Sequence, residues 1–249
     1  THAPFSKSGI RMTDRFGCPR MVDLFDETLR KGPISNRNTF IVGPSGSGKS
    51  FFTNNMVYYL LRAGMHVSIV DVGHSYRRLC EVMGGRYITY QKENPISFNP
   101  FYYQNLAPRE EDEDALSELL LSLWKTDNER VTNAELTTIR DIIHNYYQSL
   151  RSERERNSRI FPCFDTFYDY TRHSYPEVFA RNGGREGKEF DLMNFLYCLK
   201  PYYRDGQYGF LLNSRQNIDL MDLPFVIYEL DNIKDHPVLF PVTTIMIMN

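Results

Sequence analysis

Two kinds of hydrophobic pattern alternate over the first hundred residues. Short runs of β-branched and aromatic residues, typical of buried strands, occupy residues 39–42, 66–72 and 86–90. Apolar positions at helical spacing, followed by glycine, occupy residues 51–61 and 75–83. Because strands and helices alternate, we expect an α/β layer with parallel strand pairing.

The extreme N-terminal part carries a different pattern. Residues 10–12 and 21–25 are largely apolar, and they flank a turn-rich segment at 14–19. This arrangement predicts a β-hairpin, with an irregular arm as the alternative.

Helical spacing dominates from Pro108 to Tyr203. An acidic stretch at 109–118 leads into a leucine-rich helix, and Thr132 with Glu135 forms a capping-box pattern at the start of the next. An aromatic helix from Asp165 and a helix over 190–199 follow. We therefore predict about four helices and no strand in this region.

The α/β pattern returns near the end of the chain. Residues 209–212 and 223–230 predict strands, and 237–248 predicts a helix with proline in its first turn. The fold class predicted is α/β, with a parallel-sheet core and an inserted all-α subdomain. The predicted divisions are 1–106 (hairpin and first part of the core), 107–205 (all-α insertion) and 206–249 (return to an incomplete core).

Composition excludes some classes of protein. The net charge of −2, from 29 basic and 31 acidic residues, argues against a globally basic nucleic-acid binder. The four cysteines are far apart and form no C-x-x-C pair, which argues against a metal site or disulfide framework and favours a reducing compartment. No apolar run is long enough to span a membrane.

Residues 43–50, Gly-Pro-Ser-Gly-Ser-Gly-Lys-Ser, match the phosphate-binding motif G-x-x-x-x-G-K-[ST] at every fixed position. Glycines let the loop direct backbone N–H groups at phosphate oxygens, and the helix that follows adds its positive end. Lys49 is the predicted catalytic cation on the β- and γ-phosphates of ATP, and Ser50 is the predicted Mg²⁺ ligand. The predicted cofactor-binding residues are Pro44, Ser45, Gly46, Ser47, Gly48, Lys49, Ser50 and Phe51.

Hydrolysis of ATP also needs an acid near Mg²⁺ and a group that orients water. Two apolar strands end in acids, at Asp71 and Glu229, but neither carries an adjacent Asp-Glu pair. Each is therefore a weak catalytic candidate, and a strand-end acid that caps the next turn is the alternative.

Other features have simple structural explanations. Paired tyrosines at 102–103, 146–147 and 202–203 are interpreted as core or interface residues rather than platforms for nucleic-acid bases. Arginines at 77–78 and 151–159 are interpreted as a solvated surface, although contact with DNA phosphates stays open.

Several segments together resemble one family. They are Asn36-Arg37-Asn38, residues 43–52, the Val-Asp-Val-Gly-His-Ser-Tyr run at 70–76, the Pro-Ile-Ser-Phe-Asn-Pro-Phe run at 95–101, and residues 228–230. The chain resembles the TraG-type ATPases of conjugative transposons, within the large cytoplasmic ATPase family of type IV secretion systems. The runs at 70–76 and 95–101 are far more specific than the P-loop alone.

The resemblance implies a RecA-like motor domain, related to the HerA and FtsK motors, with an all-α insertion. It implies a homo-hexameric ring at the cytoplasmic face of the inner membrane, with other channel proteins as partners, that powers pilus biogenesis or substrate transfer in conjugation. It also implies an Asp-Glu pair beyond Asn249, so the chain is expected to be a piece of a longer ATPase and weak in hydrolysis. A DNA-pumping coupling protein and a nucleotide-gated scaffold are the alternatives.

Overall fold

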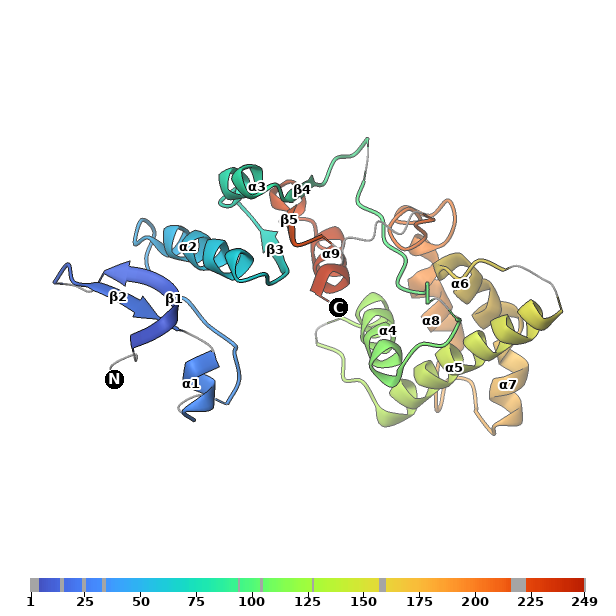
Figure 1. The fold of residues 1–249 in the computed structure, drawn as a ribbon. Helices are drawn as coiled ribbons and strands as arrows, with labels where there is room; N and C mark the ends of the chain where they lie inside the picture. Colours follow the sequence, from blue (N-terminus) through green and yellow to red (C-terminus); the bar gives the residue numbers. More distant parts are fainter. Residues whose placement is uncertain are drawn as a thin grey trace. The chain divides into compact units, whose positions relative to one another are not determined.

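The computed structural model describes residues 5–13, 16–23, 26–32, 35–93, 95–103, 105–126, 128–156, 160–215 and 223–248. The chain divides into two compact units (Figure 1). Unit 1 is formed by Thr1–Thr89 and Asp219–Asp231, and unit 2 by Tyr90–Ile218 and Asn232–Asn249, each within the described residues. The subdomain boundaries expected near residues 106 and 205 stay a prediction.

Unit 1 contains the predicted parallel sheet. Its strands are β3 (Val67–Asp71), β4 (Arg86–Thr89) and β5 (Phe225–Glu229), in the order β3-β5-β4. Both pairings are parallel, and all five residues of the central strand β5 are buried. A continuous apolar strand in the middle of a parallel sheet is the expected pattern when both faces are covered.

Two helices pack against this sheet. They are α2 (Lys49–Arg62) and α3 (Arg77–Met83), and the core of unit 1 is made of Val57, Cys80, Phe225 and Ile227. The turn between α3 and β4 needs glycine, because a Cβ atom on Gly85 would lie 2.6 Å from the ring of Phe225. The turn therefore lies too close to Phe225 of β5 to hold a side chain at residue 85.

The predicted β-hairpin is confirmed. Strand β1 (Phe5–Thr13) pairs antiparallel with β2 (Pro19–Val22), and a short helix α1 (Asp26–Arg30) follows. The Asn55 side-chain amide on α2 donates to the carbonyl oxygen of Arg11 at 3.3 Å, which fixes the hairpin to that helix. Leu24, Phe25 and the turn residues Asp14 and Arg15 lie outside the described residues.

Two predicted strands are wrong. Residues 39–42 belong to no strand of the described sheets, and Phe40 is 89% exposed. A β-branched run forms a strand only when a neighbouring backbone pairs with it, and no described strand does so here. Residues 209–212 form turns, although Leu211 and Leu212 are fully buried. Their apolar character reflects burial, which a short run does not distinguish from strand structure.

Unit 2 is mainly helical, and its described residues between Pro108 and Tyr203 form helices as predicted. Its helices are α4 (Glu110–Trp124), α5 (Asn133–Glu155), α6 (Phe164–His173), α7 (Tyr175–Arg181), α8 (Leu192–Leu199), the 3₁₀ turn η1 (Lys200–Tyr202) and α9 (Leu239–Met248). The expected aromatic helix is divided at Ser174, which raises the described helices between Pro108 and Tyr203 to five α-helices. Within the described part of that region, the only β feature is an isolated bridge between Glu186 and Phe190.

The capping box that starts α5 is confirmed. The N–H of Glu135 donates to Thr132 Oγ1 at 3.2 Å, and the N–H of Thr132 donates to Glu135 Oε2 at 2.8 Å. Lys125 Nζ donates to the other oxygen of Glu135 at 2.8 Å. The N-terminus of this helix is therefore satisfied by side chains and tied to the end of α4.

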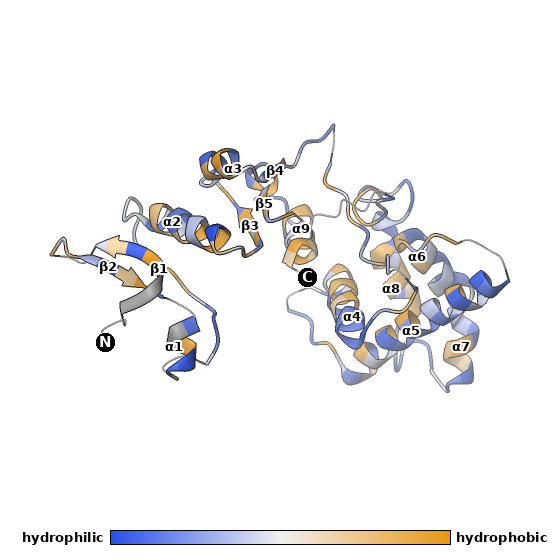
Figure 2. Ribbon diagram, viewed as in Figure 1, coloured by the Kyte–Doolittle hydropathy of each residue, from blue (hydrophilic) through white to orange (hydrophobic). Residues whose placement is uncertain are grey.

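Aromatic side chains form the core of unit 2. Phe101, Tyr146, Phe164 and Phe167 are each at most 1% exposed, and the ring centroids of Phe101 and Phe167 lie 5.0 Å apart. Figure 2 shows hydrophobic residues along most of α9 and on one face of α4 and α5. In the part of the chain that the structure describes, no helix combines the length and apolar character needed to cross a membrane.

None of the four cysteines, all of which lie within the described residues, forms a disulfide bond.

Candidate functional site

The glycine-rich motif forms a turn that leads directly into α2. Gly46 and Gly48 adopt φ values of 76° and 89°, in the left-handed region that favours glycine, and both are exposed. The N–H of Ser47 donates to the carbonyl oxygen of Pro44 at 3.2 Å and closes the loop. No protein atom lies within 4 Å of the Cβ position at either Gly46 or Gly48, so a ligand can approach the backbone.

Lys49 folds back over this loop. Its Nζ donates to the carbonyl oxygens of Gly43 at 2.7 Å and Pro44 at 2.9 Å. The Cβ position of Gly43 lies 2.5 Å from Ser47 Oγ, so a side chain at residue 43 would displace the Ser47 hydroxyl. The ammonium group is held by weakly competing carbonyl oxygens, which a more strongly negative phosphate oxygen can replace.

The predicted binding residues Pro44–Phe51 thus lie together, in one loop and the first turn of a 14-residue helix. Ser50 is exposed, and Phe51 is 83% exposed. The free N–H groups and positive end of a helix this long favour an anion at that position. The donor set, backbone N–H groups with one ammonium and one hydroxyl, fits a nucleotide phosphate with Mg²⁺.

The two strand-end acids meet at the carboxyl edge of the sheet. Asp71 on β3 is in register with Glu229 on β5, and the two residues are 7% and 0% exposed. Sequence alone shows two acidic strand ends, whereas the structure pairs them.

Four donors surround the Glu229 carboxylate. Oε1 accepts from the N–H of Gly73 at 3.2 Å and of Asp231 at 3.0 Å. Oε2 accepts from the N–H of His74 at 2.8 Å and from the Tyr87 hydroxyl at 3.0 Å. Because a carboxylate has about four acceptor positions, these bonds occupy its capacity. The geometry favours the alternative in which Glu229 caps the following turns.

The two acids differ in pKa. Burial raises the pKa of Asp71, although the N–H of Ser75 donates to its Oδ2 at 2.6 Å. Burial acts in the same direction on Glu229, but the backbone N–H groups of Asp231, Gly73 and His74 outweigh it and hold its pKa below the ordinary value. Glu229 is therefore the more acidic member of the pair, and the Tyr87 hydroxyl donates its proton to it.

The proton on Tyr87 also determines the form of His74. His74 Nδ1 lies 2.9 Å from the Tyr87 hydroxyl oxygen. Because that hydroxyl donates its one proton to Glu229, we assign the proton between the two side chains to Nδ1 of His74.

Sequence reasoning missed the side chains that join the loop to the sheet. Thr53 and Asn54 on α2 contact the segment after β3, where Tyr76 donates to Thr53 Oγ1 at 2.7 Å. Their signal in the sequence is weak: two polar residues within the apolar pattern of α2. The sequence marks residues 70–76 as a family-specific segment, but it does not show that this segment contacts α2.

Three of the six paired tyrosines are buried core residues, as interpreted from the sequence. Tyr146, Tyr147 and Tyr202 are buried, whereas Tyr102 is 41% exposed. Arg77 is exposed and pairs with Glu81 on the same helix. Residues 157–159 of the arginine-rich run lie outside the described residues.

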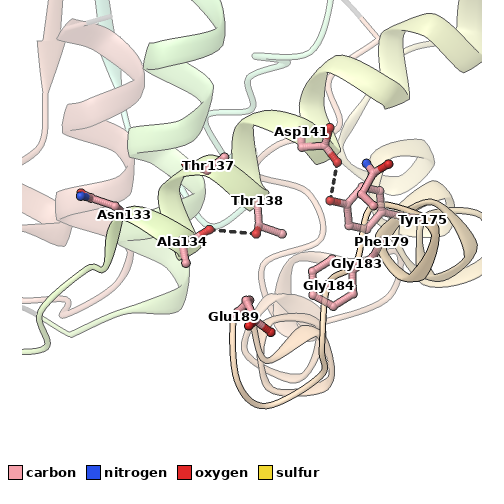
Figure 3. Close-up of a pocket in the computed structure, with 11 residues that line it drawn as sticks. Asn133, Ala134, Thr137, Thr138, Asp141, Tyr175, Phe179, Gly183, Gly184 and Glu189 are labelled. Atoms are coloured by element: carbon pink, nitrogen blue, oxygen red, sulfur yellow. Dashed lines mark hydrogen bonds between the residues drawn. The ribbon is translucent and has the colours of Figure 1, made fainter.

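Unit 2 contains a cavity of about 450 Å³ between α5 and the segment from α7 to Glu189 (Figure 3). The Tyr175 hydroxyl donates to Asp141 Oδ2 at 2.6 Å, and Glu189 forms an ion pair with Arg185. Both carboxylates at the cavity are therefore already satisfied by protein groups. The P-loop in unit 1 is the better candidate for a functional site.

A glycine-rich loop leading into a helix, beside a parallel sheet, defines a P-loop domain of the α/β class. A family model described as the TraG P-loop domain matches residues 9–249. The chain therefore belongs to the TraG P-loop domain family, which confirms the resemblance seen in its sequence.

Two comparisons agree with this assignment. Protein TraC of Escherichia coli (strain K12) is 26% identical over 222 residues, which cover 87% of this chain and 22% of TraC. The structure of VirB4 of Thermoanaerobacter pseudethanolicus matches with a TM-score of 0.59 at 18% identity, over 95% of this chain and 60% of that one. At this identity the VirB4 match shows the fold. The chain spans only part of the length of each.

Proposed function

We propose that this chain is the ATP-binding part of a motor ATPase that powers type IV secretion or conjugative transfer. The observation that carries the proposal is the P-loop itself, with Lys49 over the loop and Ser50 exposed at the start of α2. Membership of the TraG P-loop domain family supports the motor role.

The chemistry follows from the donors present. Loop N–H groups and Lys49 would hold the β- and γ-phosphates, and the Ser50 hydroxyl would hold Mg²⁺. The bound Mg²⁺ would neutralise charge that develops on the phosphate oxygens. The chain's own contribution would be to orient the phosphates by the backbone donors of the loop.

The wider setting rests on the family. We propose that the longer protein hydrolyses ATP as a homo-hexameric ring, at the cytoplasmic face of the inner membrane, and docks with other channel proteins. Intact Lys49 and Ser50 support a hydrolysing motor over the non-hydrolysing, nucleotide-gated scaffold, whose sequence signature would be a degraded P-loop.

Lys49→Ala tests the nucleotide site. The variant should bind ATP at least about 100-fold more weakly, because it loses charged hydrogen bonds to two phosphates. Calorimetry with Mg²⁺ and ATP measures this loss, and circular dichroism checks that the variant is folded. Arg62→Ala, a charge removed from the far end of the same helix, should bind as the unmodified chain does. Unchanged ATP affinity in a folded Lys49→Ala variant would sink the proposal.

A further inference from the structure

We propose that the turn Val72–Tyr76 is a tether that positions the first turn of α2 for Mg²⁺-nucleotide binding. In this proposal Tyr76, Thr53 and Asn54 are positioning residues: they act through Lys49 and Ser50 and do not contact the nucleotide. The proposal rests on nucleotide binding at the P-loop, and it identifies what holds that loop in its working orientation.

On α2, the side chains of Thr53 and Asn54 form hydrogen bonds with the turn. Asn54 Nδ2 donates to the carbonyl oxygen of Ser50 at 2.8 Å and to that of Ser75, across the gap, at 3.1 Å. The Tyr76 hydroxyl donates to Thr53 Oγ1, which in turn donates toward the carbonyl oxygens of Lys49 at 3.2 Å and Ser50 at 3.1 Å. The backbone of both functional residues is thus bonded to side chains that also hold the turn.

On the sheet side, buried acids hold the same turn. Glu229 accepts the N–H groups of Gly73 and His74, and Asp71 accepts that of Ser75. His74 has a φ of 58°, which is uncommon for a residue with a side chain and persists where surrounding bonds enforce it. The turn is therefore fixed by three consecutive backbone donors before it reaches α2.

The tether has a specific functional consequence. Ser50 must present its hydroxyl to Mg²⁺ while the loop N–H groups meet the phosphates, and small errors in orientation weaken such contacts strongly. Releasing the helix from the turn should therefore reduce the part of the ATP affinity that depends on Mg²⁺. A purely structural contact would instead lower stability and leave the Mg²⁺ dependence unchanged.

The test compares ATP affinity with Mg²⁺ and with EDTA in Tyr76→Phe and Asn54→Ala. Each variant should lose about threefold to tenfold of the Mg²⁺-dependent gain in affinity, the size expected from one hydrogen bond. Tyr58→Phe is the matched control, because it removes a tyrosine hydroxyl from α2 that bonds Arg62 and not the turn. This control should retain the full gain.

Thr53 provides the rescue. Thr53→Ser keeps the hydroxyl and should bind Mg²⁺-ATP as the unmodified chain does. Thr53→Val should lose at least as much of the Mg²⁺-dependent gain as Tyr76→Phe, because it also removes the bonds to the carbonyl oxygens of Lys49 and Ser50. Combining Thr53→Val with Tyr76→Phe should add little further loss, because both remove the same bond. Full Mg²⁺-dependent gain in folded Tyr76→Phe and Asn54→Ala would overturn the tether. Equal ATP affinity in the unmodified chain and Lys49→Ala would instead overturn the proposed nucleotide site.

Discussion

The two units of this chain are built from different interactions. Unit 1 has a small apolar core around Ile227, and its sheet edge is organised by two buried acids, Asp71 and Glu229. Unit 2 is organised by stacked and edge-to-face aromatic rings around Phe167. In unit 1 hydrogen bonds determine where backbone groups point, and in unit 2 close packing determines where helices lie.

The difference matches the work that each unit does. A loop that binds phosphate must present backbone N–H groups at fixed positions, and directional hydrogen bonds supply such positions. Aromatic packing has less directional precision but buries much more apolar surface per residue. We therefore expect substitutions in unit 2 to cost stability and substitutions around Glu229 to cost order near the P-loop.

The largest effect on stability should come from Phe167→Ala. This ring is fully buried and packs against Phe101 and Tyr146, so its removal should lower the free energy of unfolding of unit 2 by about 3–5 kcal/mol. Urea titration followed by the fluorescence of Trp124 measures it, since Trp124 is the only tryptophan and is buried in unit 2.

Tyr197→Ala is the control for that substitution, because Tyr197 is 76% exposed in the same unit. It should change the free energy of unfolding by less than about 0.5 kcal/mol. Equal losses in the two variants would contradict the assignment of the core to buried aromatic rings.

Glu229→Gln should lower the free energy of unfolding of unit 1 by a smaller amount, about 1–3 kcal/mol. The amide presents an NH₂ group to donors that now bond a carboxylate oxygen, and leaves some of them unsatisfied. Hydrogen exchange should show faster exchange of the N–H groups of Gly73 and His74 than in the unmodified chain. Protection of both groups at the original level would show that another acceptor holds this turn.

Asp71→Asn is the matched variant, and pH separates the two acids. Glu229 has a lowered pKa, so its stabilisation is complete above its ordinary value of 4.5 and is lost as the pH falls through the lower folded pKa. Asp71 has a raised pKa, so its contribution is complete below 3.8 and is lost as the pH rises through the raised folded pKa. The free energy of unfolding is measured from pH 3 to 7. Asp71→Asn should remove the loss of stability that occurs as the pH rises, and Glu229→Gln should remove the loss that occurs as the pH falls.

The smallest effect should come from Thr132→Ala, at the start of α5. Loss of the cap should lower the free energy of unfolding of unit 2 by about 1 kcal/mol, because the N–H of Glu135 loses its acceptor. The Trp124 fluorescence titration measures it, and Thr132→Ser should restore the value of the unmodified chain. If Thr132→Ala leaves the midpoint unchanged, the cap contributes nothing to this unit.

Sequence predicted the features that depend on neighbours along the chain. The P-loop, the helix after it and the capping box at Thr132 are each set by residues a few positions apart, and all three are present. The donors around Glu229 could not be predicted, because Gly73 is 156 positions away and meets it only through strand register. The strand expected at 39–42 failed for the same reason: its apolar pattern is local, but its pairing is not.

We expect the segment before the P-loop to affect how this protein behaves in concentrated solution. Phe40 and Val42 are 89% and 77% exposed, on a stretch that pairs with no strand among the described residues. Exposed apolar residues on a backbone that pairs with no described strand favour association between molecules. Purification of this chain is therefore best kept at low concentration, and a lysine in place of Phe40 is a rational way to improve its solubility.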